Sequence, residues 1–108
     1  MEEKEKIISL NKAISDLDIS HNYFLNVFSS KGLEAGILRL KEGDNDIQVP
    51  HSIDEIYFVV DGKGSLEIEG KINAVKSGDF IFVPANAHHK FTLDSTSKSL
   101  LVIYFFGS

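Results

Sequence analysis

Apolar and polar residues alternate along most of the chain, in short runs that turn residues interrupt. The run from Ser65 to Glu69 shows this most clearly, because Leu66 and Ile68 alternate with polar side chains. A period of two is typical of a strand with one buried face. Similar runs occupy residues 22–28, 33–40, 55–60, 80–83, 89–93 and 100–106. Many short strands joined by glycine-containing turns predict an all-β domain, folded as a sandwich or a small barrel.

Side-chain parity predicts which residues of two of these runs face the interior. Glu55 and Tyr57 fall on one face of the run that begins at Glu55, and His89 falls on the apolar face of the run that it begins. We therefore expect Glu55 and His89 to open the inward faces of two strands, with His88 pointing away. The other face of the run from Glu55 is also apolar, so we expect that strand to be covered on both sides.

Helical spacing occurs near the N-terminus. Apolar side chains recur there at intervals that place them on one helix face: Ile7, Leu10, Ile14 and Leu17. A strand followed by one helical turn, capped by Asn11 or Ser15, fits the same residues equally well. In either form we expect residues 1–20 to be an N-terminal strap, packed on a main domain of residues 21–108.

Length, charge and cysteine content exclude several classes of protein. A chain of 108 residues is long enough for one buried core but not for two domains. The formal net charge of -5 argues against nucleic-acid and anionic-membrane partners, which need clustered lysine and arginine. The absence of cysteine excludes disulfides, thiolate zinc sites and cysteine nucleophiles. The first residues are acidic and no run approaches the ~20 apolar residues of a membrane helix, so we expect a cytoplasmic protein.

Glutamate, histidine, glycine and proline recur at fixed intervals in two stretches of the chain. Six residues separate Glu55 from Gly62 in the first stretch, and the second contains Gly78, Pro84 and His89. In these spacings the chain resembles a small single-domain cupin, whose two motifs place the same residue types at the same intervals. The resemblance covers about residues 33–106 and implies a cupin-type jelly-roll β-barrel of antiparallel strands with a metal site inside it.

The chain departs from the cupin pattern at specific positions. His51 fits the second histidine of the first motif, but the place of the first histidine holds Val49, or Gln48 with the other permitted spacing. In the second motif Asn86 replaces a glycine. The resemblance therefore implies a reduced set of metal ligands: His51, Glu55 and His89.

Two imidazoles and one carboxylate form a facial triad, which leaves positions on a divalent transition metal open for water, dioxygen or substrate. Gln48 could supply a weak fourth oxygen. Glu55 on an otherwise apolar face supports metal binding, since a buried carboxylate is costly without a cation. The set suits iron, manganese, nickel, zinc or cobalt and does not choose among them. The alternative is a barrel that has lost its ion, with histidines satisfied by backbone groups.

Tyr57 lies two residues after Glu55 and on the same face. Its hydroxyl could act catalytically as an acid or base, or hold a substrate beside the metal. It could equally be a core aromatic whose hydroxyl finds a protein partner. Arg39, between apolar neighbours, could bind a substrate carboxylate inside the barrel or lie solvated at an edge.

The resemblance implies metal-dependent binding and conversion of a small, oxygen-bearing molecule by dioxygenase, lyase, decarboxylase or isomerase chemistry. The sequence does not select among these reactions, because a fold does not fix a function. A non-catalytic barrel that binds or senses a small ligand is the alternative. The apolar run 100–106 and the outward face of the run 55–60 exceed what one chain would bury, which predicts a homodimer.

Overall fold

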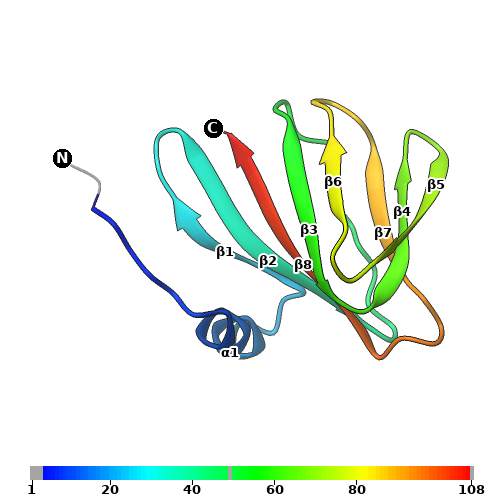
Figure 1. Cartoon of the computed structure of the whole chain (residues 1–108), viewed down its shortest axis with the longest axis horizontal. Coiled ribbons are helices and arrows are strands. Elements are labelled where there is room, and N and C mark those ends of the chain that lie inside the picture. Colours follow the sequence, from blue (N-terminus) through cyan, green and yellow to red (C-terminus); the bar gives the residue numbers. More distant parts are fainter. Residues whose placement is uncertain (1–3, 49, 108) are drawn as a thin grey trace.

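The computed structural model describes residues 4–48 and 50–107. In these residues one helix precedes eight strands: α1 (Leu10–Ser20), β1 (Phe24–Ser29), β2 (Leu33–Lys41), β3 (Glu55–Asp61), β4 (Lys63–Ile68), β5 (Lys71–Lys76), β6 (Phe80–Val83), β7 (His89–Leu93) and β8 (Ser99–Gly107). The strands pair antiparallel in a five-stranded sheet of order β1-β2-β8-β3-β6 and a three-stranded sheet of order β5-β4-β7 (Figure 1). The predicted all-β fold is confirmed.

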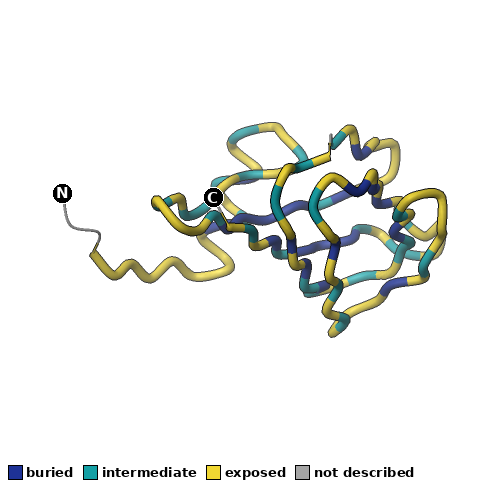
Figure 2. Tube along the Cα trace, turned by 90° about the horizontal axis from the view of Figure 1, so that it is seen from above, coloured by how far each residue is buried: buried dark blue, intermediate teal, exposed yellow. Residues whose placement is uncertain are grey.

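The two sheets enclose one apolar core. Its fully buried side chains come from strands of both sheets: Leu38, Leu40, Tyr57, Val59, Leu66, Val83, Phe91, Leu100 and Val102. Figure 2 shows that buried positions lie within the body of the molecule, whereas the chain near the N-terminus is exposed and extends away from it. The core therefore joins the two sheets into a single barrel.

The inward parity predicted for β3 and β7 is confirmed. Glu55, Tyr57 and His89 are buried, and His88 is exposed. The expectation that β3 is covered on both faces is wrong for the single chain, because Ile56 on the outward face is 45% exposed. An apolar side chain on the outward face makes burial of that face favourable. It does not determine whether another element of the chain packs there.

The N-terminal segment contains a helix, so the alternative of a strand with one helical turn is wrong. α1 starts after Ser9, whose hydroxyl accepts a hydrogen bond from the Lys12 backbone N–H. A serine that precedes the first helical residue satisfies an amide that has no partner within the helix. Asn11 and Ser15 lie inside α1 and do not cap it.

α1 packs on the outward face of the five-stranded sheet. Ala13 and Leu17 are buried there against Ile37 of β2. Leu17 was expected on this face, but Ile7 precedes the helix and is 97% exposed. Residues 1–3 of the expected strap lie outside the described residues. No helix among the described residues is long and apolar enough to cross a membrane.

The alternation of apolar and polar residues did not predict β5. Only Val75 of this strand is buried, whereas Ile72 is 70% exposed on the other face. With one large apolar side chain on each face, the alternation does not reveal which face is inward.

The glycines of the two motifs are turn residues. Gly62, between β3 and β4, has a φ of 96°, and a Cβ there would lie 2.0 Å from the Ser99 carbonyl oxygen. Gly78 has a φ of 93° in the turn before β6. Only glycine adopts this backbone conformation without strain. These residues position the strands that carry the site and contribute no side chain to it.

Candidate metal centre

His51, Glu55 and His89 meet between the two sheets, with Glu55 and His89 buried. Glu55 opens β3 in the five-stranded sheet and His89 opens β7 in the three-stranded sheet, whereas His51 lies in the loop before β3. Oε1 of Glu55 is 3.4 Å from Nε2 of His89 and 3.8 Å from Nε2 of His51. One donor atom from each residue lies within 4.8 Å of the other two. The two sheets thus bring these three side chains to one point.

The Glu55 carboxylate is buried and incompletely paired. Glu55 is 2% exposed, and no group in the described residues donates a hydrogen bond to its Oε1 atom, although both imidazoles are near. A buried carboxylate oxygen without a donor is costly in an apolar interior. A divalent cation shared with two imidazole nitrogens would supply the missing partner. The donor set therefore fits a divalent transition metal.

His89 presents its Nε2 atom to the centre. Its Nδ1 atom lies 3.0 Å from the Ala87 carbonyl oxygen, which can only accept, so Nδ1 carries a proton. In the neutral ring Nε2 is then free to bind a metal. Burial lowers the pKa of His89, but the Glu55 carboxylate 3.4 Å from Nε2 and the hydrogen bond to Ala87 raise it, and the net pKa lies above its ordinary value. Without a cation, the site therefore favours a second proton on this ring.

His51 forms the outer rim of the site. Its side chain is 32% exposed, and its ring stacks on Phe106 with centroids 5.2 Å apart and planes 17° from parallel. Its backbone carbonyl accepts a hydrogen bond of 2.6 Å from the Asn86 N–H. Asn86 has a φ of 66°, in the left-handed region that asparagine tolerates better than most residues. Asn86 thus preserves the turn for which the cupin pattern has glycine.

Tyr57 connects His89 to Gln48. Its hydroxyl donates to Gln48 Oε1 over 3.0 Å and lies 2.9 Å from His89 Nε2. Burial raises the pKa of Tyr57 far above its ordinary value, and the Glu55 charge raises it further. The hydroxyl therefore stays protonated, and the oxygen of Gln48, expected as a fourth ligand, is engaged by it. Val49 lies outside the described residues.

Asp46 is a buried group at this site that sequence analysis missed. It is 4% exposed, and its carboxylate accepts hydrogen bonds from the Tyr23 hydroxyl and the Phe91 backbone N–H. It also accepts from the backbone and side-chain N–H groups of Gln48. Asp46 ends a run of charged and polar residues that is typical of a solvated turn. No sequence signal distinguishes it from its exposed neighbours.

A cavity of about 460 Å³ is lined by two of the three candidate ligands, His51 and Glu55, and by Gln48. Leu38, Tyr104 and Phe106 supply much of its apolar wall. Burial raises the pKa of the Tyr104 hydroxyl to about 12, so this wall is uncharged near neutral pH. The size and the mixture of apolar walls with a few polar groups are typical of a small-molecule site.

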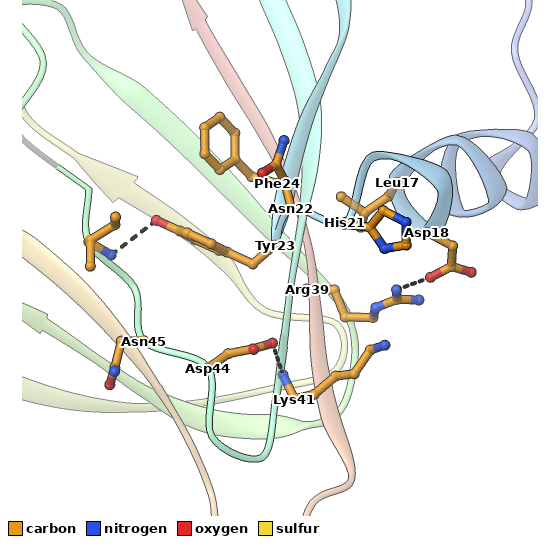
Figure 3. Close-up of a pocket in the computed structure, with 11 residues that line it drawn as sticks. Leu17, Asp18, His21, Asn22, Tyr23, Phe24, Arg39, Lys41, Asp44 and Asn45 are labelled. Carbon is orange, nitrogen blue, oxygen red and sulfur yellow. Dashed lines mark hydrogen bonds and ion pairs between the residues drawn. The ribbon is translucent and has the colours of Figure 1, made fainter.

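A second cavity, of about 470 Å³, lies beside the end of α1 (Figure 3). Arg39 points towards α1 and pairs with Asp18, and its side chain is 16% exposed. The Asp18 pKa is lowered, chiefly by its hydrogen bond to Arg39. Both interpretations of Arg39 are therefore wrong: it lies neither inside the barrel nor solvated at an edge, because the helix supplies a carboxylate on the outward face.

Comparison with known proteins finds relatives that match most of the chain. An uncharacterized protein of Streptomyces coelicolor is 28% identical over 99 residues, which cover 92% of this chain and 94% of that protein. An acireductone dioxygenase of Leptospira biflexa is 33% identical over 109 residues, which cover 95% of this chain. The match spans only 61% of the length of that dioxygenase.

Among solved structures, an RmlC-like cupin family protein with a double-stranded β-helix fold from Methanocaldococcus jannaschii matches 99% of this chain and 92% of its own. The TM-score is 0.75 at 14% sequence identity, so this likeness concerns the fold. The family model described as a cupin domain matches residues 36–105. That match spans more than half of the chain and contains both stretches that carry the resemblance, Glu55 to Gly62 and Gly78 to His89. The chain belongs to the cupin family.

Proposed function

We propose that this cupin is a divalent-metal-dependent enzyme that converts a small, oxygen-bearing molecule by dioxygenase-type chemistry. His51, Glu55 and His89 would hold the metal. The observation that carries the proposal is the buried Glu55 Oε1 atom, which lacks a hydrogen-bond donor among the described residues and lies near two imidazole nitrogens. The dioxygenase named in Leptospira biflexa, which is similar over most of this chain, supports the reaction type.

The chain's own residues would shape the reaction space. A bound divalent metal would supply Lewis acidity and open coordination positions for dioxygen and substrate. Leu38, Tyr104 and Phe106 would exclude bulk water from the cavity and accept the apolar part of a substrate. The partly exposed His51 leaves an entrance at the rim. A cavity of about 460 Å³ limits the substrate to a small molecule.

Tyr57 would orient groups beside the metal rather than exchange a proton with the substrate. Its hydroxyl proton is directed at Gln48 Oε1, and burial keeps the pKa of the hydroxyl far above neutrality. A general acid or base works best with a pKa near the working pH. Of the two roles expected for Tyr57, the geometry therefore favours a positioning role.

Metal analysis and oxygen uptake test the proposal. Protein purified without an affinity tag or chelator should contain a stoichiometric transition metal. After loading with Fe(II), it should consume oxygen with at least one member of a panel of small enediols, diketones and hydroxybenzoates. Bound metal without oxygen uptake would replace the dioxygenase by lyase, decarboxylase or isomerase chemistry. No metal after reloading would overturn the proposal in favour of a non-catalytic ligand-binding barrel, which a ligand-induced thermal shift would then test.

We also propose that the chain forms a homodimer through the outward face of β8, β3 and β6. Ile56 on β3 pairs with Phe82 on β6 and with Phe105 on β8, so the three form a row across the strands. Phe80 lies in the next row, beside Phe58. We call Ile56, Phe80, Phe82 and Phe105 the outer patch; each is at least 38% exposed. A contiguous apolar patch of this kind marks an association surface.

A further inference from the structure

The Asp46 carboxylate lies at one end of a chain of hydrogen bonds that reaches His89. Its Oδ2 atom accepts from Gln48 Nε2 over 2.9 Å and from the Phe91 backbone N–H over 2.8 Å. Gln48 Oε1 lies 3.0 Å from the Tyr57 hydroxyl, which in turn lies 2.9 Å from His89 Nε2. This series of hydrogen bonds therefore links the Asp46 carboxylate, which is not a candidate ligand, to His89 Nε2, which is a candidate ligand atom.

The direction of each hydrogen bond in this chain follows from Asp46. A carboxylate only accepts, so the Gln48 NH₂ group must face Asp46 and the Gln48 carbonyl oxygen must face Tyr57. That carbonyl also only accepts, so the single proton of the Tyr57 hydroxyl must lie between the two. Tyr57 consequently has no proton left to donate to His89.

We propose that Asp46 is a positioning residue of the metal centre, which acts through Gln48 to keep the Tyr57 proton away from His89 Nε2. The lone pair of this nitrogen then stays available to a divalent cation. With His89 neutral, Tyr57 Oη and His89 Nε2 would face each other as two acceptors 2.9 Å apart, an arrangement that either a proton or a divalent cation on Nε2 relieves. This inference rests on the proposed function, because the cation at His89 Nε2 is the metal that the proposed function requires.

Replacing Asp46 by alanine should release these hydrogen bonds. Asparagine would not do so, because the Phe91 backbone N–H only donates and would hold the asparagine oxygen at the Oδ2 position. Alanine offers no acceptor, so the Gln48 amide is free to turn and present its NH₂ group to Tyr57. The Tyr57 hydroxyl then accepts from Gln48 and donates its proton to His89 Nε2. That hydrogen bond competes with a metal for the same lone pair.

The test is a double-mutant cycle with metal affinity as its readout. Co(II) binding is measured by calorimetry and by the visible spectrum for the wild type, Asp46→Ala, Tyr57→Phe and the double variant. Asp46→Ala should weaken Co(II) binding about tenfold or more, the scale of outer-shell effects on metal sites. Adding Tyr57→Phe should restore the affinity, because no hydroxyl proton remains to compete. A purely structural role of Asp46 predicts no rescue, and that result would overturn the inference.

A second variant guards against misfolding of Asp46→Ala, since Asp46 also accepts hydrogen bonds from Phe91 and Tyr23. Gln48→Met leaves those bonds intact and removes the acceptor of the Tyr57 proton. It should also weaken Co(II) binding and also be rescued by Tyr57→Phe. Asp44→Ala is the matched control: Asp44 lies in the same loop and accepts from the Lys41 backbone N–H over 2.8 Å, outside the series of hydrogen bonds that reaches His89. Its Co(II) affinity should equal that of the wild type.

A metal-free readout separates this inference from the proposed function. The ¹⁵N shift of His89 Nε2, recorded with the ring neutral, should report a free lone pair in the wild type. In Gln48→Met it should report an accepted hydrogen bond. If both ¹⁵N shifts agree with these expectations but the wild type binds no metal, the proposed function is wrong and the inferred direction of the hydrogen bonds is supported. If the wild type already shows an accepted hydrogen bond at Nε2, the inference is overturned whatever the metal content.

Discussion

The backbone N–H of Asn86 donates to the carbonyl oxygen of His51 over 2.6 Å. The turn after β6 therefore holds the loop that carries a candidate ligand. Asn86 makes this bond with a φ of 66°, where the cupin pattern has glycine. Asparagine and glycine share access to the left-handed region, whereas a side chain branched at Cβ does not. Backbone geometry thus accounts for this departure from the pattern.

The effect of substituting Asn86 on the free energy of unfolding should depend on how readily the new residue adopts the left-handed conformation. Asn86→Gly should leave the free energy of unfolding close to that of the wild type. Asn86→Val should lower it by about 1–2 kcal/mol, the cost of a left-handed conformation for a residue that does not tolerate it. Urea denaturation measures both variants. Equal midpoints for the valine and glycine variants would show that this turn does not need a left-handed residue.

Removal of candidate ligands should separate metal binding from folding. His51→Ala should abolish stoichiometric metal binding and leave the β-rich circular-dichroism spectrum unchanged, because this side chain is at the rim. Glu55→Gln should also lose the metal, since the amide removes the negative charge while keeping the shape of the buried group. Elemental analysis after reloading and dialysis measures the metal.

His88→Ala is the control for this series. His88 is adjacent to His89 but exposed, on the opposite side of β7. It should retain full metal content. Metal loss in His88→Ala equal to that in His51→Ala would mean that the ligands are not the three side chains that face the interior.

Parity and spacing predicted the parts of this site that lie on strands. Glu55 and His89 each begin a strand whose alternation fixes the inward face, so their burial followed from the pattern. Asp46 and Gln48 lie in an irregular loop, where no periodicity tells which polar side chain turns inward. The burial of Asp46 depends on donors from two distant segments, at Tyr23 and Phe91. Hydrogen bonds from distant segments depend on the tertiary fold and leave no signal in the local sequence.

His89 should give the metal-free protein a pH-dependent stability. Burial lowers the pKa of this imidazole, the nearby Glu55 carboxylate and the hydrogen bond to Ala87 raise it, and the net folded pKa lies above 6.5. A group whose pKa rises on folding stabilises the protein fully below its unfolded pKa, and the stabilisation is lost as the pH rises through the folded value. We expect the melting temperature of the metal-free protein to fall as the pH rises from below to above 6.5.

The His89→Asn variant is the control, and its melting temperature should lack this decline. Metal should change the sign of the effect. Protons compete with the cation for His89, so the stabilisation by added Co(II) should grow over the same pH interval. A metal-free melting temperature that falls with rising pH by the same amount in the wild type and in His89→Asn would contradict the assignment to this residue.

The outer patch should control the oligomeric state. The chain has a mass of 12.0 kDa, and light scattering at micromolar concentration should give twice this mass for the wild type. Phe82→Glu should give the monomer mass, because a charge in the centre of an apolar interface is left without a partner or solvent. Ile72→Glu is the matched control: Ile72 is 70% exposed and lies on β5, in the other sheet. It should leave the dimer intact, so a monomeric wild type, or equal dissociation by both variants, would contradict the assignment of the interface to β8, β3 and β6.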